Sequence, residues 1–415
     1  MQNVLVNLQR LLMIFAGENT YKCYRRCRSR VACGPVIKRE SMKEQNFRQI
    51  QEKLNGVTRR DFMKFCSAVA AGMALPEAVV PKIAHAISSP QRPPVIWLHG
   101  SECTGCSMSL LRSEHPSIEK LIFDLISLDF HETLSAGAGH QAESALHQAV
   151  EENYGKFILV VEGAIPLKDG GIYCQVGGKN FVDSVKEIGA QAGAVIAVGS
   201  CASWGGVAAM EPNPTECVGV QSVLTDKTVV SIPGCPPNPY NLLSTVIHYL
   251  TFNKLPALDK KNRPKFAYGR LIHEHCERRP HFDNGRFARQ FGDEGHRQGY
   301  CLYYLGCKGP VTYANCSTSQ FGDAGSGCWP VAIGHPCFGC AEQGVGFHMP
   351  QFSTSPVLHA TPAAEHAPIT VERGQGVSAG SAALMAGLGG AAIGAGAVFT
   401  AKLGTKGSAD EDEKA

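Results

Sequence analysis

The sequence predicts an α/β protein in which a doubly wound parallel-sheet domain is followed by an irregular cysteine-rich domain and a C-terminal transmembrane helix. Three observations predict this order. Short apolar runs rich in β-branched residues alternate with helical patterns over residues 87–250. Most of the 17 cysteines lie in the middle of the chain, in ordered sets. Residues 374–401 contain no Asp, Glu, Lys or Arg, and form a stretch long enough to cross a bilayer.

The first domain is predicted over residues 87–250. Its strand patterns are continuous apolar runs, which are typical of strands buried on both faces of a parallel sheet. They cover residues 95–98, 157–161, 194–198 and 228–232. Helical patterns separate them near residues 107–112, 140–153, 179–191 and 239–250. This alternation predicts a flavodoxin-like, doubly wound fold.

Charge and cysteine content narrow the function classes. The formal net charge is only +3, and basic residues are mixed with acidic ones, so no basic face predicts nucleic-acid binding. The cysteines are too many for chance buried thiols and too irregularly spaced for a small disulfide scaffold. Metal binding is therefore the favoured explanation.

The first cysteine set follows the predicted strands. Its members are Cys103, Cys106, Cys201 and Cys235. The loops after parallel strands emerge at one carboxyl edge, so the four thiols are expected to converge on one site. A CxxC pair alone also fits a redox dithiol or half of a zinc ribbon. A ribbon would need its second pair about 15 to 20 residues away, whereas the next CxxC pair is Cys337 and Cys340.

The second domain, residues 251–350, is rich in Pro, Gly, His and Cys and has no strand pattern. It carries two more sets: His273, Cys276, Cys301 and Cys307, then Cys316, Cys337 and Cys340. Bound metal clusters would hold this domain in a defined fold, because its hydrophobic core is too small to do so alone. Iron-sulfur clusters take thiolates from several loops, and one imidazole can replace a thiolate. Three such sets predict a chain that conducts electrons.

Three alternatives stay open for the ligands. One His and three Cys also fit structural zinc. His275 could replace His273 as the imidazole ligand. Cys328 could add a fourth thiolate to the third set and make that cluster four-iron.

The N-terminal part predicts export. Residues 58–86 hold the pair Arg59 and Arg60, a mildly apolar run over residues 65–75 and a small-residue site at 84–86. This combination is typical of a twin-arginine signal, a route for proteins already folded around cofactors. Residues 1–57 are an extension that such a signal does not need. Met42 is the expected start, which makes residues 1–41 an over-extended reading of the gene.

The C-terminal part predicts a membrane anchor. Residues 351–373 form a proline-containing linker, and residues 374–401 a single transmembrane helix. Lys402 and Lys406 follow it, so the positive-inside bias places residues 402–415 in the cytoplasm. The predicted location is the periplasmic side of the inner (cell) membrane.

Five motifs together resemble the small subunit of membrane-bound nickel-iron uptake hydrogenases. The motifs are Glu102-Cys103-Thr104-Gly105-Cys106, Gly199-Ser200-Cys201-Ala202-Ser203-Trp204-Gly205-Gly206, Pro233-Gly234-Cys235-Pro236-Pro237-Asn238-Pro239, His273-Glu274-His275-Cys276 and Gly334-His335-Pro336-Cys337-Phe338-Gly339-Cys340. The resemblance extends from the arginine pair to the anchor and leaves out only residues 1–57.

The resemblance implies three clusters. It implies a proximal 4Fe-4S cluster on the first set, a distal 4Fe-4S cluster on the second with His273 as a ligand, and a medial 3Fe-4S cluster on the third. It also implies that the nickel-iron centre lies in a separate large subunit, so this chain has no catalytic residue of its own. The implied acceptor is a quinone-linked membrane protein, either a cytochrome b or a ferredoxin-like protein with an integral membrane partner.

Two glycines indicate to which subgroup of that family the chain is similar. Oxygen-tolerant members carry extra cysteines at the positions of Gly105 and Gly206, so the glycines predict a standard, oxygen-sensitive enzyme of the hydrogenase-2 type. Pro330 matches a proline that the family commonly keeps where a fourth medial ligand could lie, but the insertion containing Cys328 departs from the family pattern. A hydrogen sensor, a complex I-like quinone-reductase subunit and a structural zinc protein are the rival functions.

Overall fold

The computed structural model describes residues 59–88, 92–113, 121–319, 321 and 329–361. All of them belong to one compact unit, Met1–Ala367. Cys328, most of the predicted linker and the predicted anchor at residues 374–401 lie outside the described residues.

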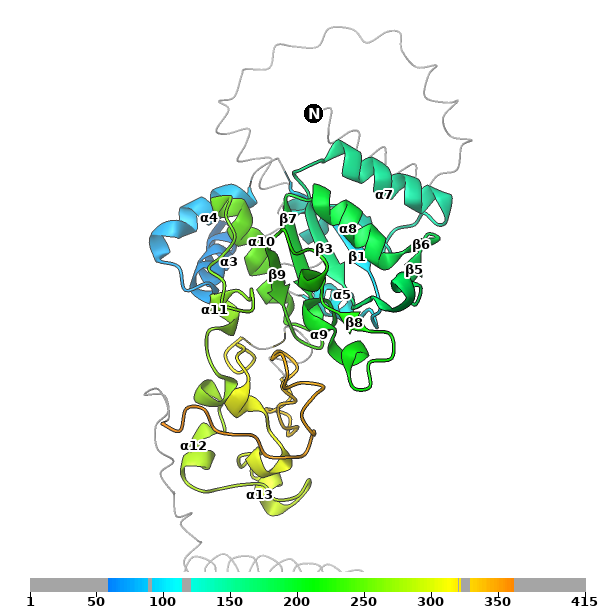
Figure 1. The fold of residues 1–415 in the computed structure, drawn as a ribbon. Helices are drawn as coiled ribbons and strands as arrows, with labels where there is room; N and C mark the ends of the chain where they lie inside the picture. The colour runs from blue at the N-terminus through cyan, green and yellow to red at the C-terminus, as the bar shows by residue number, and fades with distance from the viewer. Residues whose placement is uncertain (1–58, 89–91, 114–120, 320, 322–328, 362–415) are drawn as a thin grey trace, which may run out of the picture. The chain divides into compact units, whose positions relative to one another are not determined.

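The main element of the described chain is a five-stranded parallel sheet. Its strands are β1 (Pro94–His99), β2 (Ser127–His131), β3 (Ile158–Glu162), β7 (Ala194–Val198) and β9 (Val229–Ile232). They lie in the order β2-β1-β3-β7-β9 (Figure 1). Counted along the chain this is 2-1-3-4-5, the flavodoxin-like order. The predicted α/β fold with a parallel sheet is confirmed.

Helices cover both faces of this sheet. The helices are α5 (Gly105–Leu111), α7 (His140–Glu152), α8 (Phe181–Gln191) and α10 (Pro239–Phe252) (Figure 1). On one face of the sheet, side chains of α5 and α10 pack in a hydrophobic core with Trp97 of β1. On the opposite face, side chains of α7 and α8 pack in a second core with Leu98 of β1. Successive strand residues point to opposite faces, so this two-sided burial explains the continuous apolar runs.

Strand β2 is not among the strands predicted from the sequence. It pairs only with β1, at one edge of the sheet. Its first three residues are only partly buried, and Ser127, Asp129 and His131 are polar. An edge strand does not need an apolar run, so this one has no such signal.

Shorter elements connect the strands. Two antiparallel pairs join β4 (Ile165–Pro166) to β8 (Cys217–Val218) and β5 (Gln175–Val176) to β6 (Lys179–Asn180). The short helices of this region are η4 (Leu121–Leu125), η5 (Lys168–Gly171), α9 (Gly199–Trp204), η6 (Gly206–Ala209) and η7 (Val220–Ser222). Of these, α9 begins directly after β7 and carries Cys201 of the first cysteine set.

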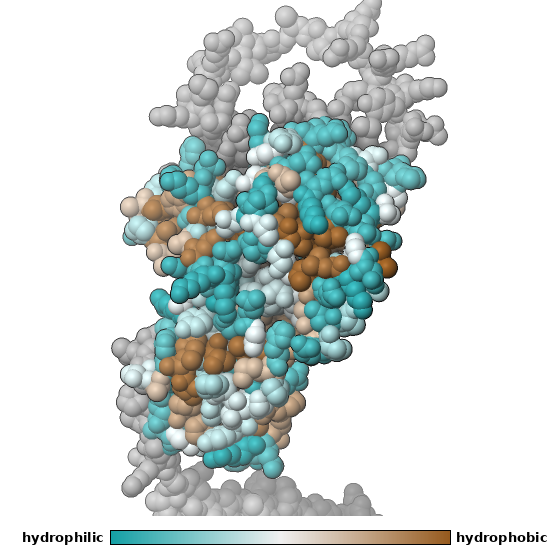
Figure 2. Space-filling model, in the orientation of Figure 1, coloured by the Kyte–Doolittle hydropathy of each residue, from teal (hydrophilic) through white to brown (hydrophobic). Residues whose placement is uncertain are grey.

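The described part of the predicted export signal forms helices. They are α3 (Arg59–Gly72), η3 (Glu77–Val79) and α4 (Val80–Ile87). Cys66 and Ile83 are fully buried in a small core that they share with Ile247 of α10. Figure 2 shows apolar side chains on this part of the surface.

The described residues of the cysteine-rich region form short helices and isolated bridges, and no regular strand is found among them. Within residues 251–319 and 329–350, the helices are α11 (Lys265–Tyr268), η8 (Ile272–His275), α12 (Arg279–Asp283), α13 (Glu294–Arg297), η9 (Tyr303–Leu305) and η10 (Gly309–Val311). Isolated bridges join Leu271 to Tyr313 and Phe287 to Cys301. No helix in the described part of the chain is both long and apolar enough to cross a membrane.

Candidate iron-sulfur sites

Loops at one edge of the sheet carry the first cysteine set. Cys103 lies in the turn after β1, and Cys106 is the second residue of α5. Cys201 lies in α9, directly after β7, and Cys235 follows β9. A Cβ atom added to Gly199 would lie 2.5 Å from Cys106 Sγ, so the start of α9 passes directly against that thiol. The structure therefore brings these loops to one place.

The four thiols of this set influence one another. Burial raises the pKa of Cys106 above the usual thiol range, the Glu162 charge raises it further, and so do the other three cysteines. Burial is also the main cause that raises the pKa values of Cys201 and Cys235 to about 11. Grouped anionic sulfurs repel one another, and a bound metal cation favours their deprotonated form. This donor set fits a cluster that takes four thiolates.

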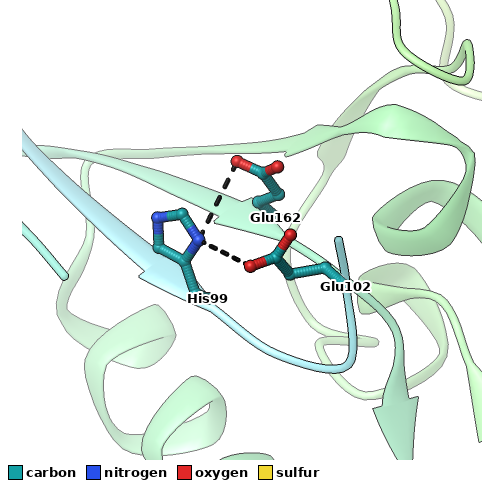
Figure 3. Close-up of side chains that lie close together, drawn as sticks. All are labelled: His99, Glu102 and Glu162. Atoms are coloured by element: carbon teal, nitrogen blue, oxygen red, sulfur yellow. Dashed lines mark hydrogen bonds and ion pairs between the residues drawn. The ribbon is translucent and has the colours of Figure 1, made fainter. Parts of the chain in front are cut away.

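A buried carboxylate holds the loop that carries Cys106. Glu162, the last residue of β3, accepts hydrogen bonds from Cys106 N at 2.9 Å, Ser107 Oγ at 2.6 Å and Trp97 Nε1 at 3.2 Å. His99 Nδ1 lies 3.1 Å from Glu102 and 3.9 Å from Glu162 (Figure 3). Glu162 was not predicted from the sequence. The sequence contains one indication of its role, because Glu162 is a charged residue directly after the apolar run at residues 157–161.

The second set gathers around η8 and η9. Cys276 follows η8, Cys307 follows η9, and Cys301 pairs with Phe287 in an isolated bridge. Burial raises the pKa of Cys276 above the usual thiol range, and Cys307 raises it further. Burial and then Cys307 also raise the pKa of Cys301 to about 12. The three thiols therefore share one buried site.

His273 has the properties of a ligand in this second site. Its side chain is buried, and its Nε2 atom has no hydrogen-bond partner in the described part of the chain. Burial, and then the charge of Arg279, lowers its pKa to about 4, so the ring is neutral and can offer a lone pair. A Cβ atom added to Gly309 would lie 3.4 Å from Cys307 Sγ and 3.7 Å from His273 N. His275, the alternative ligand, is only partly buried and has an interaction of its own.

The third set consists of three buried or partly buried cysteines. Burial, and then Cys340, raises the pKa of Cys316 to about 12. Burial raises the pKa of Cys337 well above its usual value, and Cys307, Cys340 and Cys316 raise it further. Cys328, the possible fourth ligand, lies outside the described residues, and Pro330 is exposed.

The third set lies next to both of the others. After burial, the charge of Cys340 is the largest cause that raises the pKa of Cys235 in the first set. In the same way, the charge of Cys307 in the second set is the largest cause, after burial, that raises the pKa of Cys337. Hydrogen bonds follow the same pattern. Ser200 Oγ donates to Cys340 O at 2.6 Å, and Lys308 N donates to Cys337 O at 2.8 Å. The order in space is therefore first, third, second.

Two family models match the chain. The model described as NADH ubiquinone oxidoreductase, 20 Kd subunit, matches residues 103–249. The model for the C-terminal part of the NiFe/NiFeSe hydrogenase small subunit matches residues 268–353. The two matches together contain all three cysteine sets.

Curated relatives and solved structures agree with these matches. The chain is 55% identical over 350 residues to the hydrogenase-2 small chain of Escherichia coli strain K12, covering 84% of this chain and 94% of the relative. It is 49% identical over 288 residues to the periplasmic [NiFe] hydrogenase small subunit of Solidesulfovibrio fructosivorans, covering 69% and 90%. The reduced, active Ni-Fe-Se hydrogenase of Desulfomicrobium baculatum superposes with a TM-score of 0.60 at 34% identity, over 64% of this chain and all of that one. On these grounds the chain belongs to the small-subunit family of nickel-iron hydrogenases, the oxidoreductase component that transfers electrons and pairs with a large subunit.

Proposed function

We propose that this chain is the electron-transfer small subunit of a membrane-anchored, periplasm-facing uptake hydrogenase. Electrons from hydrogen oxidised in the large subunit enter at the first cysteine set and leave near His273 for a quinone-linked membrane protein. The observation that carries this proposal is the position of the third set between the other two. The charge of Cys340 acts on Cys235 of the first set, and the charge of Cys307 of the second set acts on Cys337. That arrangement makes one continuous series of sites.

The proposed ligands follow the three sets. A proximal 4Fe-4S cluster takes the first set, a distal 4Fe-4S cluster the second and a medial 3Fe-4S cluster the third. The buried, unpartnered Nε2 of His273 supports its choice over His275 as the distal imidazole ligand. The clusters supply one-electron redox chemistry, and the protein sets their potentials through ligands, burial and nearby charge.

The spread of the sulfurs favours clusters over single zinc ions. Thiolates bound to one tetrahedral zinc lie about 3.8 Å apart, because each Zn–S bond is about 2.3 Å. Among the described residues, only His99, Glu102 and Glu162 bring three ligand atoms all within 4.8 Å of one another. The sulfurs of each cysteine set are therefore more widely spread than zinc requires.

An open, partly apolar surface next to the first set supports entry of electrons there. Cys103 and Cys235 are exposed, whereas the cysteines of the other two sets are buried or partly buried. Met108 and Val207, beside Cys106 and Cys201, are 53% and 55% exposed. Exposed apolar side chains around a redox site fit a surface that a partner covers. We assign this surface to the large subunit.

The enzyme is proposed to be of the standard, oxygen-sensitive type. An added Cβ atom would lie 3.1 Å from Cys103 Sγ at Gly105 and 2.8 Å from Cys201 Sγ at Gly206. Both glycines therefore border the first set, where extra cysteine ligands would otherwise enter. The proximal cluster is expected to undergo a single one-electron step.

Replacing Gly206 by Ala is expected to lower the iron content of the first cluster. Gly206 has a φ of +52°, and an added Cβ would also lie 2.7 Å from Cys201 N. Positive φ alone costs a non-glycine residue about 1–3 kcal/mol, and the contact adds to that. Gly178→Ala is the matched control, because Gly178 has a φ of +79° with no atom within 4 Å. Equal iron per chain in the two variants would contradict a site built tightly around Cys201.

The membrane location rests on the terminal segments. The twin-arginine signal at residues 58–86 is proposed to export the folded protein, and residues 374–401 to anchor it. Relatives that are periplasmic or uptake hydrogenases support this location. The match over residues 268–353 is one that a complex I-like protein would lack.

The function is tested on membranes that contain the complete enzyme. Hydrogen-dependent quinone reduction should fractionate with the membrane, and the oxidised enzyme should give a three-iron electron paramagnetic resonance signal. That signal would exclude Cys328 as a permanent ligand of the third cluster. A soluble complex without quinone reduction would instead favour the hydrogen sensor.

A further inference from the structure

Lys308 is a buried lysine that lies between two cysteine sets. Its side chain is 1% exposed. It follows Cys307 of the second set directly, and its backbone N donates to the carbonyl of Cys337 in the third. A Cβ atom added to Gly339 would lie 3.0 Å from Lys308 Cβ, so the base of the lysine side chain packs on the loop between Cys337 and Cys340.

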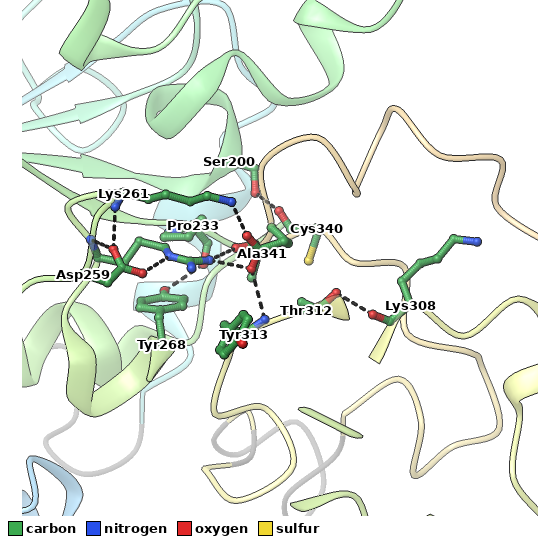
Figure 4. A network of polar contacts seen from close by, with 12 residues as sticks. Ser200, Pro233, Asp259, Lys261, Tyr268, Lys308, Thr312, Tyr313, Cys340 and Ala341 are labelled. Atoms are coloured by element: carbon green, nitrogen blue, oxygen red, sulfur yellow. Dashed lines mark hydrogen bonds and ion pairs between the residues drawn. The ribbon is translucent and has the colours of Figure 1, made fainter. Parts of the chain in front are cut away.

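Within the described residues, the hydrogen-bond partners of the Lys308 ammonium group are all neutral. Nζ donates to the carbonyl oxygen of Ser353 and, at 3.2 Å, to Ser353 Oγ. Among the described residues no carboxylate lies within ion-pair distance of it. Figure 4 shows its side chain extending away from the network of Asp259 and Lys261. An isolated ammonium is costly to bury, so its counter-charge must come from another kind of group.

Two sulfurs among the described residues act on the charge of Lys308. Burial lowers its pKa, while the charges of Cys307 and Cys337 raise it. One sulfur belongs to the second set and the other to the third. Reduction of a cluster adds a negative charge, and a nearby positive charge stabilises the reduced form more than the oxidised one.

We propose that Lys308 is a fixed positive charge shared by the second and third clusters, and that it raises the reduction potentials of both. The proposal rests on the proposed function, which places a cluster on each set. Lys308 would act through the electric field of its ammonium group, without binding iron itself. Because this charge raises both potentials together, it changes the difference between them little, and that difference is what drives electron transfer from one cluster to the other.

Arg278 provides the matched comparison. It is 8% exposed, and its guanidinium group donates to the carbonyls of Tyr300 and Ala332, with no carboxylate partner among the described residues. Its backbone N donates to Cys276 Sγ at 3.4 Å, a bond that a side-chain substitution keeps. Its charge acts on Cys301 and Cys307, both of the second set. Removing this charge should therefore lower the potential of the second cluster alone.

The test is a redox titration of the purified two-subunit enzyme, followed by electron paramagnetic resonance. Lys308→Met should lower both the second and third potentials, by about tenfold in each reduction equilibrium or ~59 mV for one electron. The first cluster should not move, and Lys308→Arg should keep both potentials near the natural values. Arg278→Gln should lower only the second. Unchanged potentials in Lys308→Met, or equal shifts in Lys308→Arg, would overturn the proposal.

A second variant covers the case in which Lys308→Met fails to assemble. Ser353→Asp keeps the lysine side chain and places a carboxylate beside its ammonium group, so it should lower the same two potentials. No shift in an assembled Ser353→Asp enzyme would also overturn the proposal. If the natural enzyme itself lacks three cluster signals, the proposed function fails. If it has them and the potentials do not move, only the role of Lys308 fails.

Discussion

Replacing His273 by Leu is expected to slow electron delivery to the membrane acceptor by at least about tenfold, a size typical of disturbed metal sites. The imidazole is buried and neutral, and its Nε2 has no hydrogen-bond partner among the residues that the structure describes. Leu fills the space but offers no lone pair, so the proposed distal cluster would lose a ligand or take another. The measurement is hydrogen oxidation with the quinone-linked acceptor and with a small dye.

The large subunit should assemble normally in this variant, because His273 lies in the second set and the partner is assigned to the first. Its nickel content is therefore expected to stay unchanged. His275→Leu is the matched control, since it removes a neighbouring imidazole that is only partly buried. Quinone and dye reduction that both stay at the natural rate would refute the assignment of His273 as the exit ligand.

Replacing Arg263 by Met is expected to destabilise the third cluster site by about 3–5 kcal/mol, the usual cost of breaking a buried ion pair. The Arg263 side chain is 4% exposed. Its Nη1 lies 2.9 Å from Glu342 Oε2 and also donates to Ala341 O, next to Cys340. Its Nε lies 2.8 Å from Asp259 (Figure 4). Met leaves the Glu342 carboxylate buried with fewer partners.

The expected readout is a lower melting temperature together with loss of the three-iron signal. Lys261→Met is the control, because Lys261 pairs with the same Glu342 but its side chain is 36% exposed. An exposed pair of this kind contributes only about 0–1 kcal/mol. If both variants keep a natural melting temperature and third-cluster signal, then Arg263 does not support the loop that carries Cys340.

Much of the sheet and of the first set could be predicted from the sequence, because both follow from one rule. Strands buried on both faces read as apolar runs, and loops after parallel strands meet at one edge. Cys201 and Cys235 could therefore be placed beside Cys103 despite their distance along the chain. Strand β2 could not, because an edge strand lacks that run.

Tertiary contacts decide the features that the sequence left open or did not reveal. His273 and His275 are two residues apart, and only the packing around η8 makes one buried and the other partly exposed. Glu162 holds Cys106 across 56 positions of sequence, and Lys308 finds its acceptor 45 positions away. No local pattern marks such partners, since burial and charge balance arise only when the loops meet.

Metal and acid-labile sulfide analysis of the anaerobically purified two-subunit enzyme decides whether the three cysteine sets hold iron-sulfur clusters or zinc. Two 4Fe-4S clusters and one 3Fe-4S cluster predict about 11 iron atoms and about 12 acid-labile sulfides for each copy of this chain. The nickel-iron centre of the large subunit adds one nickel and one more iron, so the two-subunit enzyme should hold about 12 iron atoms in all. About one zinc for each cysteine set, with no labile sulfide, would contradict the account.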